Sequence, residues 1–409
     1  MDRLLLLLPT TTYRTQAFVD AATKLGVDLV CAADRPNVFE ADAPDHLVTL
    51  DFNDPAAAAA RAAELHRRAP ITAVVAVDDL TTVVASTIAE RLRLPANSVA
   101  ATTAARNKHD LRCRLAAAGV PQPRFRTVPL DDDPGRAAAV THYPSVLKPL
   151  TLSASRGVIR ADSPVEFVVA FRRIAKLLQR EDVTVSGDGA RFLLVEDYVG
   201  GDEVSLEGLL MNGRLHTLAI FDKPDPLEGP FFEETIYVTP SLLSPTMQER
   251  IRAVTGHGCA ALGLTEGPIH AELRVNEQGP LVLEIAARSI GGLCSRTLVF
   301  GTGMSLEEVI LRHALRWPIE SLTREHRAAG VMMIPIPRPG RLGAVRGRER
   351  ALAVPGIEDV VITMHAGQEL VPLPEGYQYL GFIFARGDRP EGVTQALRDA
   401  HAALTFEID

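Results

Sequence analysis

Short apolar runs alternate with amphipathic segments through the first 95 residues of the chain. The apolar runs, each of strand length, are residues 4–8, 29–33, 47–50 and 73–77. The segments that repeat apolar positions every three to four residues are 15–25, 55–68 and 81–92. Strands that alternate with helices predict a parallel sheet with helices on its faces. We therefore expect a Rossmann-like α/β domain over residues 1–95.

The last of these predicted strands ends at Asp78 and Asp79. In an open parallel sheet ligands bind beyond the carboxyl ends of the strands, so Asp78 could contact a substrate. The other interpretation is that one of the two carboxylates caps the helix that follows. The first strand is not followed by a Gly-x-Gly-x-x-Gly sequence, which argues against dinucleotide binding.

Beyond residue 95 the pattern changes to a mixture of helices and strands. We expect a helical linker over 96–123 with a helix at 104–118, then a small mixed lobe over 124–190 with a helix at 163–180. A larger lobe should follow over 191–330. The last segment, 331–409, predicts a separate α+β domain with strands at 330–336, 359–363 and 379–385 and a helix at 390–404. The fold class is thus multidomain, with α/β and α+β parts.

A predicted β-hairpin over residues 271–285 is the most informative segment. Two alternating apolar segments flank a turn at 276–280. Glu272 and Glu284 occupy positions that could face each other across the two strands, and Arg288 follows. Two adjacent carboxylates repel each other unless a cation lies between them, and carboxylate oxygens suit Mg²⁺. The hairpin predicts a platform for a Mg-nucleotide; the alternative is a surface hairpin with solvated glutamates.

Residues 143–158 add positive charge and a loop of small residues. A short apolar strand ends in Lys148, and Ser153 to Gly157 form a loop whose N–H groups could surround a phosphate. Taken alone, such a loop is also typical of an ordinary turn. Residues 191–203 predict a strand that runs into an acidic connection, where backbone groups could pair with an adenine edge and Glu203 with ribose hydroxyls.

Taken in order, these segments resemble the ATP-grasp superfamily of carboxylate-amine ligases over about residues 100–300. The resemblance implies that ATP lies between two lobes with Mg²⁺ or Mn²⁺, that Glu272 and Glu284 hold the metal, and that Arg288 and Lys148 are catalytic. The residues that it assigns to ATP are Lys108, Lys148, Ser153, Ser155, Arg156, Gly157, Val158, Glu196, Asp197, Tyr198, Val199 and Glu203. Ala286 stands where many members have an asparagine metal ligand, so the number of metals is open.

Residues 219–243 look like a segment of bacterial L-amino-acid ligases, and residues 381–387 with the helix after them resemble the small C-terminal domain of those enzymes. The resemblance implies amino-acid substrates. Lys223, Glu233 and Glu234 would then approach them, although a solvated loop edge has the same composition. His270 is either a substrate contact, a second-layer partner or a structural residue. Arg288 with Gly291 and Gly292 would leave room for a substrate near the backbone.

The reaction that the resemblance implies is ATP-dependent formation of an amide or peptide bond through an acyl phosphate, with release of ADP and phosphate. Two alternatives stay open. The first is a carboxylase or purine-pathway type of ligase with another nucleophile, and the second is a non-catalytic ATP-binding regulatory protein. The resemblance also allows a homodimer.

Whole-chain properties narrow the class of protein further. The 409 residues carry a net charge of −8, with dispersed Lys and Arg, which argues against nucleic-acid binding. The four cysteines lack Cys-x-x-Cys spacing, so neither a zinc site nor a disulfide network is indicated. The apolar run 4–8 is too short for an export signal, and no apolar run approaches the ~20 residues of a membrane span. We expect a cytoplasmic enzyme with small-molecule partners.

Overall fold

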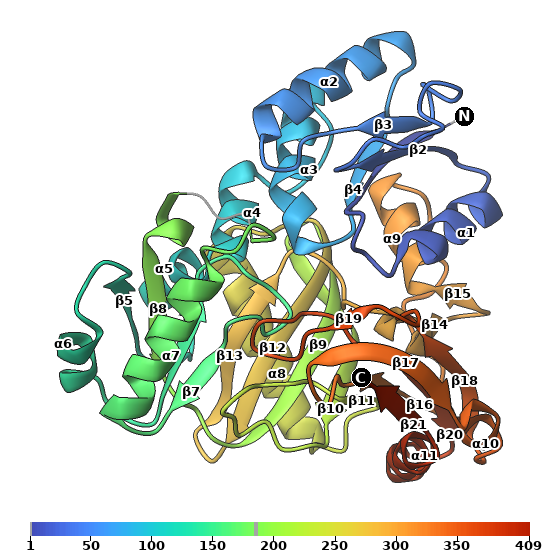
Figure 1. Cartoon of the computed structure of the whole chain (residues 1–409). Helices are drawn as coiled ribbons and strands as arrows, with labels where there is room; N and C mark the ends of the chain where they lie inside the picture. The colour runs from blue at the N-terminus through green and yellow to red at the C-terminus, as the bar shows by residue number, and fades with distance from the viewer. Residues whose placement is uncertain (1, 184–186) are drawn as a thin grey trace.

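The structure, a computed structural model, describes residues 2–183 and 187–409. Residue 1 of the predicted N-terminal domain and residues 184–186 of the predicted small lobe lie outside the described residues. Figure 1 shows the N-terminal domain at one end, the small lobe to one side, and a large sheet that runs through the middle into the C-terminal segment.

The N-terminal domain is the parallel α/β unit that the sequence predicts. Its four strands pair in the order β3-β2-β1-β4, and every pair is parallel. The central strand is pure leucine after its first residue, because helices cover both of its faces. The elements are β1 (Arg3–Leu8), α1 (Thr15–Leu25), β2 (Asp28–Ala33), β3 (Leu47–Thr49), α2 (Pro55–Arg68), β4 (Ala73–Ala76) and α3 (Asp79–Leu92).

The linker contains two helices where the sequence pattern predicts one. Helix α4 (Val99–Arg106) and helix α5 (Lys108–Ala117) meet at Asn107. The Asn107 side chain accepts hydrogen bonds from the N–H groups of His109 (3.0 Å) and Asp110 (3.4 Å), which caps α5. The predicted helix at 104–118 was wrong because the asparagine side chain competes with the helical backbone for these donors.

The small lobe has an antiparallel sheet in the order β5-β8-β6-β7. Helix α7 packs on it through Phe167, Phe171 and Ile174. The predicted boundary at 190/191 cuts off β8, which pairs with both β5 and β6, so this sheet extends to Asp197. The elements are β5 (Phe125–Pro129), α6 (Pro134–Ala139), β6 (Ser145–Pro149), β7 (Ile159–Ala161), α7 (Pro164–Leu177), the short 3-10 helix η1 (Gly187–Ala190) and β8 (Phe192–Asp197).

The large lobe is built on an eight-stranded sheet in the order β13-β12-β9-β10-β11-β16-β20-β18. Helix α8 covers one face and begins with Pro245 after the capping residue Ser244. Its elements are β9 (Asp202–Met211), β10 (Arg214–Lys223), β11 (Ile236–Thr239), α8 (Pro245–Leu262), β12 (Gly267–Asn276), β13 (Gly279–Ala286), η2 (Cys294–Thr297), β14 (Val299–Phe300), β15 (Met304–Ser305) and α9 (Leu306–Ala314).

The C-terminal segment continues this sheet instead of forming a sheet apart from it. Strand β16 pairs with β11 on one side and with β20 on the other. The predicted boundary at 330/331 therefore falls inside β16, and the C-terminal segment shares this sheet with the large lobe. The elements are β16 (Ala328–Ile334), β17 (Gly340–Arg346), α10 (Arg348–Leu352), β18 (Ile357–Ile362), β19 (Glu369–Leu370), β20 (Gly381–Gly387), α11 (Pro390–Ala402) and β21 (Thr405–Ile408).

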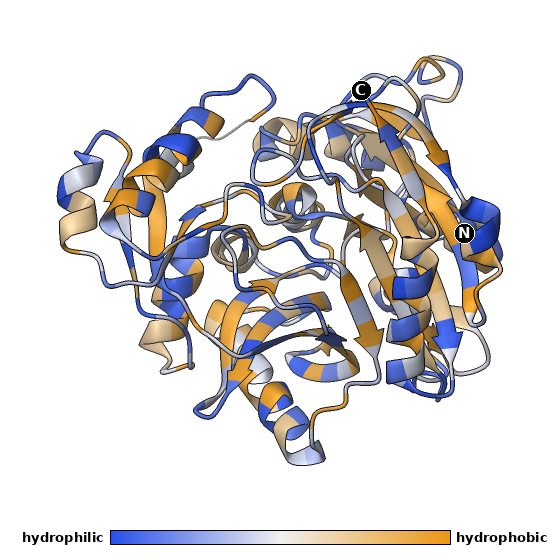
Figure 2. Cartoon of the chain, turned by 60° about the horizontal axis from the view of Figure 1, so that its bottom comes forward, coloured by the Kyte–Doolittle hydropathy of each residue, from blue (hydrophilic) through white to orange (hydrophobic). Residues whose placement is uncertain are grey.

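Five buried apolar clusters lie between these layers, and one of them joins the N-terminal domain to the large sheet. That cluster contains Leu4 and Leu6 of β1 together with Val309 of α9 and Phe382 of β20. Figure 2 shows hydrophobic strands beneath helices whose outward turns are hydrophilic. No helix in the described part of the chain is long and apolar enough to cross a membrane.

Candidate active site

One face of the large sheet is polar although it is buried. Along β9 the residues Glu203, Ser205 and Glu207 alternate with Val204 and Leu206, so the three polar side chains share a face. The apolar residues point toward α8 and its cluster. The neighbours in register on that polar face are Lys223 of β10 and His270, Glu272 and Arg274 of β12. A buried polar face must satisfy its own charges, which makes it the place to look for chemistry.

The ammonium group of Lys223 lies among three carboxylates. Its Nζ is 2.7 Å from Glu203 and 2.8 Å from Glu272, and it also donates to Glu234. We call these four residues the Lys223 cage. Burial lowers the pKa of Lys223, but the three carboxylates raise it well above its usual value. Burial and the charge of Glu272 raise the pKa of Glu234 to about 8. The cage thus brings together residues that the sequence assigned separately to ribose, metal and substrate.

His270 is held by protein groups on both sides of its ring. Its Nδ1 bonds with Glu207, and its Nε2 lies 3.5 Å from Glu272. Burial lowers the pKa of His270, but Glu207 raises it to about 9, so the imidazole is charged at neutral pH. Glu207 also accepts the N–H of Ile290 at 2.8 Å. Of the open interpretations for His270, the geometry favours a partner that orients Glu272.

Glu272 and Glu284 are direct partners across β12 and β13, as the hairpin predicts. A bulge follows Glu272, and bulges are frequent beside active sites. Glu284 lies 3.4 Å from Nζ of Lys108, the first residue of α5. Burial raises the pKa of Glu272, but Lys223 and His270 hold it well below its usual range. Glu272 is therefore ionised at neutral pH.

The donor set on this hairpin fits a divalent cation. The side chains of Glu272 and Glu284 are partly exposed, at 20% and 25%, on an otherwise buried face. Glu203, Glu234 and Glu272 also lie close enough together to hold a metal, with ligand atoms within 4.8 Å of one another. The ammonium of Lys223 already occupies the middle of that trio. Glu272 and Glu284, by contrast, keep accessible oxygen atoms of the kind that Mg²⁺ prefers.

Arg288 lies beside the Glu272–Glu284 pair and contacts the N-terminal domain. Its Nε donates to Asp79 at 2.9 Å. Burial raises the pKa of Asp79, but Arg288 brings it below its usual value. Neither predicted cap forms a side-chain bond to α3: Asp78 holds the N-cap position without one, and Asp79 binds the arginine. Ala286 is buried opposite His270 and supplies no metal ligand.

Lys148 is fixed by a buried carboxylate. Its Nζ lies 2.7 Å from Glu196, whose other oxygen lies 2.5 Å from Nε of Arg112 on α5. Burial raises the pKa of Glu196, but Arg112 and Lys148 lower it to about 2. The Glu196 side chain is thus committed to two cations and cannot contact adenine. Lys148 itself keeps 13% of its side chain exposed.

The loop from Ser153 to Val158 has an unusual backbone. Ala154 and Ser155 have positive φ angles of 56° and 54°, and Gly157 has 74°. Left-handed conformations of residues other than glycine are uncommon and concentrate at functional sites. The Lys108 ammonium donates to the carbonyl of Leu152 at 2.8 Å, at the entrance of the loop. The loop therefore lies beside Lys108, as a phosphate loop requires.

Several residues that the sequence assigns to ATP contact other protein groups in this structure. The guanidinium of Arg156 lies 2.5 Å from Asp182 and also donates to the carbonyl of Glu375. Asp197 accepts from Arg124 at 2.6 Å. Both oxygens of Glu203 are used, one by Lys223 and the other by Arg274 at 3.0 Å, so the predicted ribose contact of Glu203 is not supported.

The remaining predicted residues lie in different surroundings. Tyr198 is sandwiched between Arg160, whose guanidinium carbon is 4.1 Å from the ring centroid, and Phe232; Val199 follows it in the connection to β9. Glu233 lies beside the backbone of Ile336. Gly291 has open space where a Cβ would be, whereas a Cβ on Gly292 would meet Phe382 at 2.9 Å.

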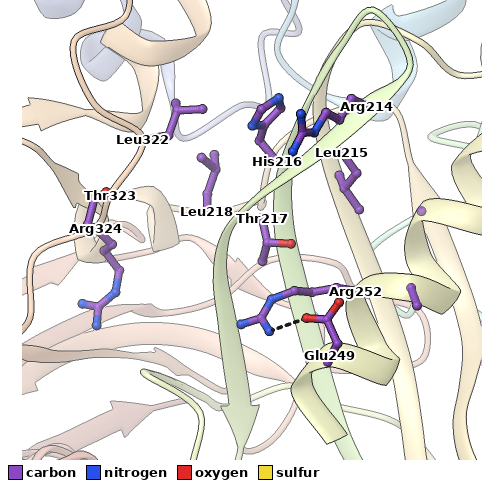
Figure 3. Close-up of a pocket in the computed structure, with 12 residues that line it drawn as sticks. Arg214, Leu215, His216, Thr217, Leu218, Glu249, Arg252, Leu322, Thr323 and Arg324 are labelled. Atoms are coloured by element: carbon purple, nitrogen blue, oxygen red, sulfur yellow. Dashed lines mark hydrogen bonds and ion pairs between the residues drawn. The ribbon is translucent and has the colours of Figure 1, made fainter. Parts of the chain in front are cut away.

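A cavity of about 750 Å³ lies at the other end of β10, between α8 and residues 322–324. Its basic groups include Arg214, Arg252 and Arg324, and Arg252 pairs with Glu249 (Figure 3). The described residues that line it are different from all those predicted above. The candidate site is thus marked by its charges and backbone, and this cavity is a separate feature of the large lobe.

Sequence reasoning missed Arg112, Glu207, Arg274 and the pairing of Asp79. The alternation of Glu203, Ser205 and Glu207 along β9 is the signal that could have found Glu207, because three polar residues on one face of a central strand need partners. Arg112 carries no such signal, since its partner Glu196 is 84 residues away in the sequence.

Comparisons with known proteins agree with this geometry. The chain matches family models for the ATP-grasp domain over residues 141–297, the ATP-grasp N-terminal domain over 19–96 and the L-amino acid ligase C-terminal domain 2 over 332–409. Dapdiamide A synthase of Enterobacter agglomerans is 26% identical over 74% of this chain and 72% of its own length. Alanine–anticapsin ligase of Bacillus subtilis (strain 168) is 28% identical over 49% of this chain and 45% of its own length.

Among solved structures, an L-amino acid ligase from Bacillus licheniformis has a TM-score of 0.84 at 25% identity, covering 100% of this chain and 99% of that one. The agreement extends from the N-terminal parallel sheet to the C-terminal segment. The chain therefore belongs to the ATP-grasp superfamily, and over its full length it is similar to a bacterial L-amino acid ligase.

Proposed function

We propose that this protein uses ATP to join the carboxylate of one amino acid, or of a related small acid, to the amine of another. The observation that carries the proposal is the facing pair Glu272 and Glu284 with Lys108 and Arg288 beside it. Two carboxylates next to two cations suit a phosphoryl transfer, in which the protein mainly positions groups and neutralises charge. The likeness to L-amino acid ligases supports amino acids as the substrates.

In this proposal each part of the site has one task. Glu272 and Glu284 hold Mg²⁺, or Mn²⁺, which when bound neutralises negative charge on the phosphates of ATP. Lys108 and Lys148 bind phosphate oxygens, together with backbone N–H groups of the loop from Ser153 to Val158. The backbone of 196–199 receives the adenine. No nucleophilic side chain is needed, because the substrate carboxylate attacks phosphorus to form an acyl phosphate.

Arg288 then orients the acyl phosphate, and the amine attacks its carbonyl carbon as inorganic phosphate leaves. The guanidinium is anchored by Asp79, so its position is set by the N-terminal domain. The amine must lose protons in this step. Glu272, which is ionised at neutral pH, places negative charge where the substrate ammonium would approach, and the ionised fraction of Glu234, whose pKa is raised to about 8, can take its proton.

The test is phosphate release from ATP and Mg²⁺ with amino acids, singly and in pairs, and mass spectrometry of every active mixture. We expect release that requires two amino acids and gives a condensed product. Glu284→Gln, which changes a partly exposed side chain, should abolish release without lowering the melting temperature. Gln278→Glu, on the exposed turn of the same hairpin, serves as the control. Release with bicarbonate alone would favour a carboxylase, and ATP binding without turnover of any acid would favour the regulatory alternative.

A further inference from the structure

Residues of the C-terminal segment contact the phosphate loop directly. The Gly157 N–H donates to the carbonyl of Pro374 at 2.9 Å. Arg156 donates through Nε to the carbonyl of Glu375 at 2.8 Å, and its guanidinium carbon lies 5.0 Å from the centroid of the Tyr377 ring. Two consecutive residues of the loop are thus bound to residues 374–377, which lie more than 200 positions away along the chain.

The same segment also binds the helix behind the loop. Glu375 accepts two hydrogen bonds from Arg173 on α7, one from Nε at 2.6 Å and one from Nη2 at 2.8 Å. This is the two-point geometry in which arginine and carboxylate interact best. Glu375 therefore connects the loop, through its carbonyl, to the helix of the small lobe, through its carboxylate.

A second contact holds the opposite edge of the small lobe. Arg160 of β7 donates to the carbonyl of Glu228 at 2.7 Å, and its N–H donates to the carbonyl of Pro230 at 2.9 Å. A Cβ on Gly229 would lie 3.0 Å from the Arg160 side chain, so the approach is close. Of these two sets of contacts, the one made by residues 374–377 reaches the phosphate loop.

We propose that Glu375 and Arg173 are positioning residues for the nucleotide: they hold the loop from Ser153 to Val158 in its left-handed shape over the phosphate site. This inference rests on the proposed use of ATP, and it assigns a part of the ATP site to the C-terminal segment. Ala154 and Ser155 adopt a strained backbone that surrounding contacts must maintain. When the Arg173–Glu375 pair is absent, the loop also populates other shapes. The apparent affinity for nucleotide then falls in proportion to the fraction of molecules whose loop keeps the binding shape.

An ordinary surface ion pair would behave differently. Arg173 and Glu375 are 42% and 28% exposed, and exposed pairs contribute little to overall stability. A purely structural role predicts at most a small change in melting temperature and no change at the loop. A positioning role predicts an unchanged melting temperature together with a loosened loop and weaker nucleotide binding.

The control is Asp359→Asn. Asp359 lies in the same C-terminal segment and pairs with Arg296 at 2.9 Å. The side chains of Asp359 and Arg296 are 33% and 41% exposed, similar to those of Glu375 and Arg173. It contacts η2 instead of the small lobe. Glu375→Gln and Asp359→Asn remove the same charge from arginine pairs of similar exposure, so a loss of protection in the loop that occurs only in Glu375→Gln reports the connection to the loop.

The experiment compares wild type, Glu375→Gln, Asp359→Asn and the exchanged pair Arg173→Glu with Glu375→Arg. Hydrogen exchange of peptides that cover 153–158 is measured without ligand, and the dissociation constant for Mg-ADP is measured by calorimetry. For Glu375→Gln we expect faster exchange in this segment and an affinity for Mg-ADP about fivefold weaker. This factor corresponds to the energy of one exposed ion pair, if that energy stabilises the binding shape of the loop. In turnover the KM for ATP rises by a similar factor while kcat changes less than twofold. The exchanged pair restores part of the protection.

The inference is overturned if Glu375→Gln matches Asp359→Asn in exchange and in affinity. It is also overturned if the melting temperature of Glu375→Gln falls in parallel with the loss of protection, because the residue would then act on folding. A wild-type protein that binds Mg-ADP and yet joins no amino acids would refute the proposed function and leave this inference standing, since neither the exchange nor the calorimetry depends on turnover.

Discussion

Lys223→Met removes the only positive charge inside the Lys223 cage and keeps nearly the same shape. The lysine side chain is 2% exposed, and Glu203, Glu234 and Glu272 surround its ammonium. Breaking a buried charge cluster by removing one partner costs about 3 to 5 kcal/mol. Here Glu234 loses its ion pair with Lys223, whereas Glu203 keeps Arg274 and Glu272 keeps His270. The unfolding entropy of a chain of this size is about 0.9 kcal/mol/K if it unfolds as one unit, so the melting temperature should fall by about 3 to 6 °C at pH 8.

The pH dependence distinguishes this mechanism from a simple packing defect. Without the ammonium, burial and mutual repulsion raise the pKa values of the three carboxyl groups in the folded protein. A carboxyl group with a raised folded pKa binds protons that the unfolded chain has already released, so stability falls as pH rises above about 4.3. In the wild-type cage Glu234, with its pKa raised to about 8, already acts in this way. The deficit of the variant should therefore be largest at pH 8 and clearly smaller at pH 5.

The assay is thermal unfolding by circular dichroism at pH 5 and pH 8, with Lys176→Met as the control. Lys176 is an exposed lysine of α7, and its loss should change stability by less than about 0.5 kcal/mol. Equal melting temperatures for wild type and Lys223→Met at pH 8 would refute the argument from uncompensated charge. A deficit that is the same at both pH values would show that the lysine contributes by packing alone.

Two further predictions concern packing and the neighbouring histidine. Gly330→Ala should lower the free energy of unfolding in urea by about 1 to 3 kcal/mol, because its Cβ would lie 2.7 Å from Val393 where α11 packs on β16. The control is Gly392→Ala, which has open space at its Cβ and should be neutral or stabilising. His270→Gln should flatten the decline of stability between pH 6.5 and pH 9. In the wild type the pKa of His270 is raised to about 9 by Glu207, so its contribution is complete below pH 6.5 and is lost as pH rises through 9.

Local patterns were sufficient for the elements and for the hairpin, and insufficient for contacts between distant segments. The period of apolar residues predicts β1 to α3, and the alternation around residues 276–280 predicts that Glu272 faces Glu284. The division into lobes is less accurate, because β8 reads as the first strand of the large lobe although it pairs within the small one. Strand partners are chosen by tertiary packing, which no period within a single segment encodes.

The same limit explains why charged residues that meet in the structure were assigned separately from the sequence. Lys223, Glu203 and Glu272 lie on three strands and received three different roles, since their common meeting point depends on the register of β9 with β10 and β12. Arg288 was singled out from the sequence, but its partner Asp79 belongs to another domain, 209 residues earlier. Sequence reasoning identified which side chains need a partner and could not identify the partner.

Glu196 shows why the internal partners matter for function. Its carboxylate, 2% exposed, holds Lys148 in place at 2.7 Å and ties the sheet of the small lobe to Arg112 on α5. Glu196→Gln keeps the shape of the side chain but removes the anion that Lys148 and Arg112 share. We therefore expect the free energy of unfolding to fall by about 3 to 5 kcal/mol at pH 7. The control is Asp197→Asn at the next position, whose pair with Arg124 is exposed and should matter by less than about 1 kcal/mol.

The pKa of Glu196, lowered to about 2, sets the pH window for this test. A depressed carboxyl pKa contributes stability that is complete above the unfolded value of about 4.3 and is lost as pH falls through 2. In urea unfolding, the difference in free energy of unfolding between wild type and Glu196→Gln should therefore be the same at pH 7 and pH 5 and smaller at pH 3. Equal losses for Glu196→Gln and Asp197→Asn would mean that the buried cations find other partners. Lys148 would then owe its position to the strand, and the carboxylate behind it would be dispensable for binding phosphate.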